Sequence, residues 1–277
     1  MFSAAKRRKN AAHGASRGLV SERITSPGGA QDPTAQLSPL MTRRRWIADE
    51  FSNTHAALTG AHADHLIRVL RARPGQQFDI ATGPIVRRGR IVTIGDNRVE
   101  FELAEEISAS PILALTLFLA IFKFDRLEWA IEKSTELGVS QIIPVIARRT
   151  DAHLAVASVK RADRWRRIAL QAAEQSRRAT PPEIAVPIKL QEAVTQPAAL
   201  RIVLAESERQ TLLSDLLAAY EQGEIALAVG PEGGWTNEEL NLFQKSGWSS
   251  ASLGSTVLRA ETAAIAATAI TVSELAA

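Results

Sequence analysis

Residues able to do chemistry concentrate in the last fifth of the chain, where two glycine-bearing loops each follow an apolar run. The first loop is GPEGG (230–234), directly after ALAV, and the second is the stretch around Leu253-Gly254. Glycine permits positive φ angles and lets backbone amides approach a ligand with no Cβ in the way. Because each loop is followed by a helix-like segment, we expect a ligand site here.

The two loops lack the signatures of common nucleotide sites. A P-loop requires Gly-Lys-Ser/Thr, and a dinucleotide fold requires GxGxxG; neither occurs in the chain. ATP hydrolysis and ordinary dinucleotide binding are therefore disfavoured. The chain also has no cysteine, which excludes disulfides, thiolate metal sites and a cysteine nucleophile. For the pentapeptide alone, a tight strand-to-helix turn remains the simpler interpretation.

Two charges stand where an alanine-rich helix is expected to begin, at Arg259 and Glu261. Charges at the edge of a core are costly unless they are paired or functional. A carboxylate at Glu261 suits the positive end of the helix dipole. Either the two residues serve the ligand site, or Arg259 pairs with Glu261 or Glu232 and only braces the loops. The alanines that follow indicate close packing, against this chain or a second copy.

From about residue 111 onward, apolar strand-like runs alternate with helix-like segments. Gly138 is predicted to end one helix, and Thr236 with Glu239 forms a capping-box pattern that opens another. Unbroken apolar strands that alternate with helices are typical of a mostly parallel sheet covered on both faces. Ligands bind such α/β sheets at the carboxyl ends of the strands. The expected elements are strands at 112–122, 141–147, 200–205, 224–230 and 250–254, and helices at 125–138, 159–175 and 211–222, with two more after 236 and 260.

Residues 43–108 have a different pattern, with short strand-like runs, turn signals and one helix-like segment at 62–72. This pattern predicts a small β-barrel or curled sheet, of a kind that often carries RNA. Arg68, Arg71 and Arg73 lie on and just after the helix. They form either a solvated basic face or an RNA contact.

The first 40 residues are rich in Ala, Ser, Gly, Pro and Arg and have no apolar period, so we expect disorder. Residues 1–45 hold a net charge of +7, which leaves −4 on the remainder of a 277-residue chain of net charge +3. A true start at Met41, a basic tail that holds RNA, and a transit peptide all stay open; the first two are favoured because no amphipathic helix is evident. No apolar run approaches the roughly 20 residues of a membrane span. We expect a cytoplasmic protein.

Several ordered blocks together resemble the RsmE-type methyltransferases of the SPOUT (trefoil-knot) superfamily, which methylate N3 of a uridine in small-subunit (16S) ribosomal RNA. The resemblance runs from about Arg43 to the C-terminus, and Trp235 is its clearest departure. The blocks are HLIRVLRARPG (65–75), KFDRLEWAIEKSTELGV (123–139), PVIARRT (144–150), AAEQSRRATPPEI (172–184), GPEGG (230–234) and LGSTVLRAETA (253–263).

The composition predicts a disordered basic extension (1–40), and the resemblance implies a PUA-like RNA-binding β-barrel (41–110) and a knotted α/β domain (111–277). It implies a homodimer that binds S-adenosylmethionine and ribosomal RNA. From the residues themselves we expect no metal and no membrane. The knot follows from the resemblance alone. The cofactor would be held by three loops, made of Leu204, Ala205, Glu206, Val229, Gly230, Pro231, Glu232, Gly233, Gly234, Ser252, Leu253, Gly254, Val257, Leu258 and Arg259.

Methyl transfer to uridine N3 requires loss of a proton and stabilisation of the negative charge that develops. Arg259 is the first candidate to stabilise that charge, and Glu261 or Glu232 could take the proton. The arginines expected to hold RNA are Arg68, Arg71, Arg149 and Arg178. Alternatives are a SPOUT methyltransferase acting on tRNA or a ribose 2′-hydroxyl, and a non-catalytic RNA-binding ribosome-assembly factor.

Overall fold

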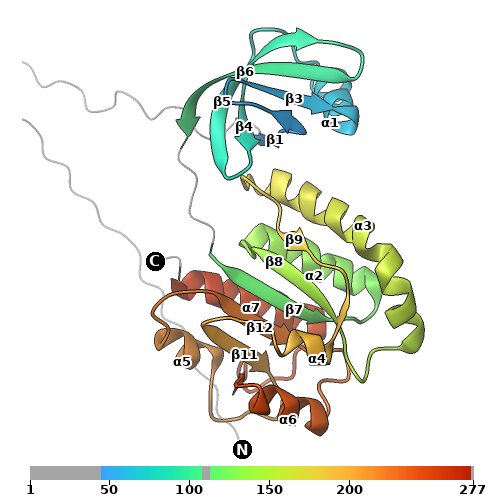
Figure 1. Cartoon of the computed structure of the whole chain (residues 1–277), viewed down its shortest axis with the longest axis vertical. Helices are drawn as coiled ribbons and strands as arrows, with labels where there is room; N and C mark the ends of the chain where they lie inside the picture. The colour runs from blue at the N-terminus through green and yellow to red at the C-terminus, as the bar shows by residue number, and fades with distance from the viewer. Residues whose placement is uncertain (1–44, 108–112, 276–277) are drawn as a thin grey trace, which may run out of the picture. The chain divides into compact units, whose positions relative to one another are not determined.

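The computed structural model describes residues 45–107 and 113–275, which fall within the unit Thr42–Ala277 (Figure 1). The expected extension at 1–40 and the expected boundary near residue 110 lie outside the described residues. These described ranges form two sheets, one of six strands and one of seven. In the described part of the chain, every helix is too short or too polar to cross a membrane.

The first sheet is mixed and has the order β1-β4-β5-β6-β3-β2, in which only the β1–β4 pair is parallel. β1 and β2 lie at the two ends of this order, yet only Ala48 and Asp49 separate them in the chain. The sheet must therefore curl until its two edges come close together. Its strands are β1 (Arg45–Ile47), β2 (Glu50–Phe51), β3 (His55–Thr59), β4 (Gln77–Thr82), β5 (Ile85–Ile94) and β6 (Arg98–Ile107).

The helix expected at 62–72 is shorter and begins earlier. It consists of α1 (Gly60–Asp64) and a π-helical turn, η1 (His65–Val69). The curled sheet closes over a small apolar core that includes Ile80 and Phe101. Gly89 of β5 lies against this core, where a Cβ would come within 2.5 Å of Ile80 Cγ1. Glycine is required there because a buried side chain has no room to move away.

The second sheet is entirely parallel, with the order β10-β8-β7-β12-β11-β13 and β9 also paired to β8. This confirms the expected parallel sheet. The strands are β7 (Leu115–Ala120), β8 (Gln141–Ile146), β9 (Glu183–Ile184), β10 (Ile188–Lys189), β11 (Leu200–Leu204), β12 (Ile225–Val229) and β13 (Ser249–Ala251).

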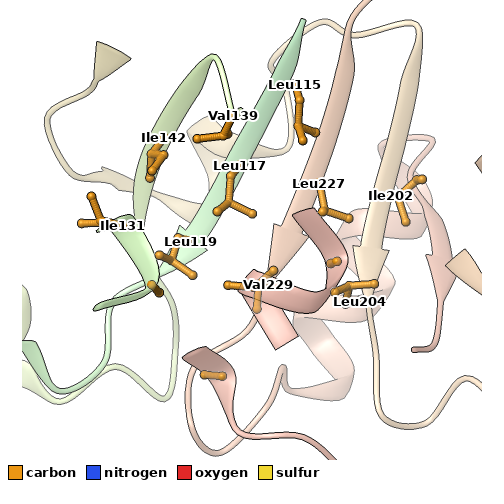
Figure 2. Close-up of a cluster of buried hydrophobic side chains, with 14 of the residues drawn as sticks. Leu115, Leu117, Leu119, Ile131, Val139, Ile142, Ile202, Leu204, Leu227 and Val229 are labelled. Atoms are coloured by element: carbon orange, nitrogen blue, oxygen red, sulfur yellow. The ribbon is translucent and has the colours of Figure 1, made fainter. Parts of the chain in front are cut away.

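Helices cover both faces of this sheet, because successive residues of its strands point to opposite faces. On β7, Leu117 and Leu119 face a core shared with α2, α3, α5 and α7, whereas Phe118 and Ala120 face a core shared with α4 and α6. Figure 2 shows Leu117 and Leu119 beside Leu227 and Val229 of β12 in the first of these cores. Each fully buried leucine contributes roughly 1.5–3 kcal/mol. The helices are α2 (Phe124–Leu137), α3 (Ala152–Gln175), α4 (Leu190–Ala193), α5 (Leu213–Ala218), α6 (Asn237–Lys245) and α7 (Ala260–Leu275).

Local sequence signals end and begin these helices as expected. Gly138 caps α2 in the left-handed region, with a φ of 111°. Thr236 caps α6 through a reciprocal box, in which its Oγ1 accepts from the Glu239 amide at 3.3 Å and its own amide donates to Glu239 Oε2 at 2.8 Å. The long helix α3 begins at Ala152, well before the expected residue 159.

Candidate active site at the carboxyl ends of three strands

A cavity of about 310 Å³ opens where β11, β12 and β13 end. This volume lies at the lower end of the usual range for small-molecule sites. Every residue predicted to hold the cofactor lines the cavity except Arg259. Residues not predicted for the cofactor also line it, namely Arg149, Ser207, Arg209, Trp235, Asn237, Leu240, Ala251, Thr256, Ala260 and Ala263.

The loop after β12 forms one wall, and its glycines are required by close contacts. A Cβ on Gly230 would lie 3.2 Å from Trp235 Nε1 and 3.3 Å from its Cε2, and Trp235 is itself buried in the core. Gly234 has a φ of 69°, where a side chain would be strained, and its amide donates to the Pro231 carbonyl at 2.8 Å. The loop is therefore a tight turn whose backbone faces the cavity.

The same loop is braced by the segment after β8. The Arg149 guanidinium donates to the Gly233 carbonyl, and a Cβ on Gly233 would lie 3.2 Å from Arg149 Cδ. One residue earlier, the Arg148 amide donates to Glu239 Oε1 at 2.6 Å. Glu239 is buried, so the charge-assisted bond ties the start of α6 to this segment. Arg149, predicted to contact RNA, thus lies in the cavity wall.

The loop after β11 also lines the cavity and is stiffened by its own carboxylate. Glu208 Oε1 accepts from the amides of Gln210, Thr211 and Arg209 at 2.8, 3.1 and 2.9 Å. These amides, with Gln210 foremost, lower the pKa of Glu208, which keeps it ionised at neutral pH. The Ser252 amide in turn donates to the Thr211 carbonyl at 2.9 Å. The loops after β11 and β13 therefore form one continuous wall.

The two candidate carboxylates have different environments. Glu261 is buried, with a side chain 4% exposed, and its Oε1 accepts from Arg126 NH1 at 3.1 Å. Its Oε2 is also buried and has no hydrogen-bond partner among the described residues. Glu232 lines the cavity and is 39% exposed, with Arg126 NH1 and Lys123 Nζ each 3.9 Å from one of its oxygens.

Arg259 lies just before α7, between two residues that line the cavity, Leu258 and Ala260. Its side chain is exposed and makes no hydrogen bond or ion pair with any residue in 45–107 or 113–275. Neither Glu261 nor Glu232 pairs with it; both instead lie near Arg126, whose NH1 is 3.1 Å from Glu261 and 3.9 Å from Glu232. The idea that Arg259 only braces these loops is therefore wrong for the described residues. Sequence reasoning missed Arg126, although it lies in the block KFDRLEW.

The remaining predicted arginines lie elsewhere. Arg178 donates to the Thr135 carbonyl near the end of α2 at 2.7 Å, and burial lowers the pKa of its guanidinium to about 10, so that it stays charged at neutral pH. Arg68 is exposed and pairs with Asp64 at 3.2 Å. Arg71 is exposed and has a φ of 51°, which is uncommon for a residue with a side chain.

Comparison with known proteins agrees with this arrangement. A family model described as an RNA methyltransferase domain matches residues 108–272. The ribosomal RNA small subunit methyltransferase E of Rickettsia conorii is 34% identical over 220 residues, covering 78% of this chain and 88% of the relative. That of Synechocystis is 35% identical over 259 residues, covering 88% and 82%.

Solved structures lead to the same family. The methyltransferase E of Neisseria gonorrhoeae, bound to S-adenosyl methionine, superposes with a TM-score of 0.75 at 30% identity over 84% of this chain and 98% of that one. The putative methyltransferase Lpg2936 of Legionella pneumophila, also with the bound cofactor, has a TM-score of 0.73 at 29% identity over 84% and 98%. The chain belongs to the family of ribosomal RNA small subunit methyltransferase E.

Proposed function

We propose that this protein transfers a methyl group from S-adenosylmethionine to N3 of a specific uridine in the 16S RNA of the small ribosomal subunit. The observation that carries the proposal is the cavity whose walls are the three loops expected to hold that cofactor. Relatives that share the family are named for methylation of small-subunit RNA, and a structural neighbour carries the cofactor.

The residues present fit S-adenosylmethionine. The glycine loops and apolar residues such as Leu204 and Val257 suit an adenine. Four charged residues, Arg149, Glu206, Arg209 and Glu232, also line the cavity. The indole N–H of Trp235 is buried and has no acceptor among the described residues, so a bound ligand could supply one. When bound, the sulfonium supplies an already activated methyl group, and the protein's task is chiefly to align the attacking atom.

For the chemistry, we propose that Arg259 stabilises the negative charge on the uridine carbonyl oxygens as N3 loses its proton. The absence of any ion pair between its side chain and residues 45–107 or 113–275 supports this role. The N3 proton passes to a carboxylate, the N3–CH3 bond forms, and the S–CH3 bond breaks to leave S-adenosylhomocysteine. Of the two candidates, the geometry favours Glu232 as the acceptor, because it lines the cavity and is half-exposed whereas Glu261 is buried against Arg126.

For RNA binding, we propose a PUA-like barrel over residues 41–110, with Arg68 and Arg71 as phosphate contacts. The curled six-stranded sheet and the exposure of both arginines support this. Arg149 and Arg178 already donate to the carbonyls of Gly233 and Thr135, so any contact with RNA would use their remaining N–H groups. Residues 1–40 would add a basic extension, and work on ribosomal RNA suits a cytoplasmic protein.

We propose that residues 111–277 form a trefoil knot. Two features support it. The last strand, β13, pairs outside β11 at the sheet edge, yet α7 packs next to α2 and α5 and shares their core. The segment between β13 and α7 must therefore cross back past the loop after β11. Ser252, at the start of this segment, contacts that loop at Thr211 and Leu212.

We also propose a homodimer through the surface of α2 and α7. Trp129 on α2 is 49% exposed, and a shallow groove beside it is lined by Leu137, Ile265 and Ala266. Replacing Trp129 with glutamate should convert the dimer to a monomer, because a carboxylate would be desolvated at the centre of the interface. Light scattering after size exclusion measures the mass. Trp129→Phe, which keeps an apolar ring, should stay dimeric; a dimeric Trp129→Glu protein would place the interface elsewhere.

The decisive experiment for the function is mass spectrometry of nucleosides from the small-subunit RNA of a strain that lacks this protein. Loss of 3-methyluridine, restored by the intact gene, is the expected result. Persistence of 3-methyluridine, with loss of a methylated tRNA nucleoside or a 2′-O-methyl ribose instead, would favour the alternative substrates. Calorimetry that detects no binding of S-adenosylmethionine would favour a non-catalytic assembly factor.

A further inference from the structure

Arg126 occupies a position between two carboxylates that come from distant parts of the chain. It lies in the first turn of α2, and its NH1 is 3.1 Å from Glu261 Oε1 and 3.9 Å from Glu232 Oε1. Glu232 lines the cavity, and Glu261 follows Ala260, which also lines it. A single guanidinium therefore links the loop after β12 to the start of α7.

The pair with Glu261 is the stronger of the two contacts. Removing one partner of a buried ion pair is strongly unfavourable, because the charge that is left has neither water nor a counter-ion. Glu261 has no second cation among the described residues, and its Oε2 already lacks a partner. Without Arg126, this carboxylate would need another positive charge. Arg259 lies two residues earlier in the chain, and its side chain, which pairs with none of the described residues, is available to supply it.

We propose that Arg126 is a positioning residue that occupies Glu261 and Glu232 and thereby keeps Arg259 unpaired for the reaction. The inference rests on the role proposed for Arg259 in methyl transfer. Loss of Arg126 lets Arg259 turn to the carboxylates, so the site loses its charge-stabilising group although that residue is still present. Arg126 itself touches neither the RNA nor the cofactor in this scheme.

The test compares Arg126→Gln with the double variant Arg126→Gln/Glu261→Gln, in which the buried charge is removed together with its partner. The assay counts methyl groups transferred to total small-subunit RNA, without regard to the nucleotide. Arg126→Gln should lower kcat roughly tenfold or more, the scale of coupling between neighbouring charges, with the Kd for S-adenosylmethionine changed less than about threefold. The double variant should recover most of that kcat, because Arg259 no longer has a buried carboxylate to neutralise.

Two further variants complete the series. Arg126→Lys keeps one charge but cannot present two donors to two carboxylates, so kcat should fall between those of the wild type and Arg126→Gln. Lys245→Gln removes an exposed cation from the last turn of α6 and should leave kcat unchanged. The midpoint of thermal unfolding, measured for every variant, detects any that fail to fold.

Three results would overturn the inference. One is an Arg126→Gln protein with normal kcat. Another is a folded, cofactor-binding double variant that is no more active than Arg126→Gln, since Arg126 would then act directly. The third is structural: a crystal structure of Arg126→Gln should show the Arg259 guanidinium within ion-pair distance of Glu261 or Glu232, and an unmoved Arg259 contradicts the proposal. The crystal structure does not depend on enzyme activity, so it tests the inference separately from the proposed function. The proposed function itself fails if the wild-type protein transfers no methyl group to RNA.

Discussion

Replacing Arg259 with alanine should abolish methyl transfer while the protein still folds and still binds S-adenosylmethionine. The side chain is exposed next to the cavity and supports no internal ion pair in residues 45–107 and 113–275, so its removal costs the fold little. Loss of one group that stabilises transition-state charge typically lowers kcat by about 100- to 1,000-fold. Single-turnover transfer to small-subunit RNA measures the chemical step, and calorimetry measures the Kd for the cofactor.

Arg259→Lys is the matched variant, since it keeps the charge but loses the planar fork. It should retain more activity than alanine and less than the wild type. Lys245→Ala serves as the control for loss of one surface cation. An Arg259→Ala enzyme with kcat within about threefold of the wild type would remove this residue from the mechanism. If Arg259→Ala lowered kcat and the affinity for the cofactor by the same factor, Arg259 would instead be a cofactor-binding residue.

Replacing Gly230 with alanine should weaken S-adenosylmethionine binding by roughly tenfold or more. The added Cβ would lie 3.2 Å from Trp235 Nε1, tighter than ordinary contact. Trp235 is buried in the core and its ring contacts that of Phe243, so it cannot easily yield. The loop must then move into or away from the cavity that it lines. Overpacking of this kind costs about 1–3 kcal/mol, and about 1.4 kcal/mol is a tenfold change in Kd.

Gly95→Ala is the matched control, because the nearest atom to its added Cβ is the Arg98 carbonyl oxygen at an ordinary 3.7 Å. It should change neither the Kd for the cofactor nor the midpoint of thermal unfolding. Gly230→Ala should lower cofactor affinity in protein whose far-ultraviolet circular dichroism is native. Unchanged affinity in a folded Gly230→Ala protein would mean that this loop does not contact the cofactor.

Much of the α/β fold could be read from local patterns. The unbroken apolar runs of β7 and β12 predicted strands buried on both faces, and the structure divides their side chains between two cores. The end of α2 at Gly138 and the start of α6 at Thr236 followed from local rules of backbone conformation and capping. Such features depend on residues within a few positions of one another, so a single sequence suffices.

Other elements could not be read this way. The start of α3 was missed because Val156 and Val159 are exposed on it and interrupt its amphipathic pattern. The two-residue strands β9 and β10 exist only as pairing partners of β8, so no local period indicates them. In both cases tertiary contacts outweigh local preference.

For the site, the sequence by itself determined the two glycine loops, their place after apolar strands, and the charges at the start of α7. Only the tertiary structure decided which partners those charges take. Arg126 and Glu261 are 135 residues apart, and Arg149 and Gly233 are 84 apart. Arg149 and Gly233 meet because β8 and β12 flank β7, so the segments after these strands lie at one edge of the sheet, whereas Arg126 and Glu261 meet because α7 packs against α2. Contacts between segments so far apart depend on strand order and helix packing, and no pattern of neighbouring residues encodes either.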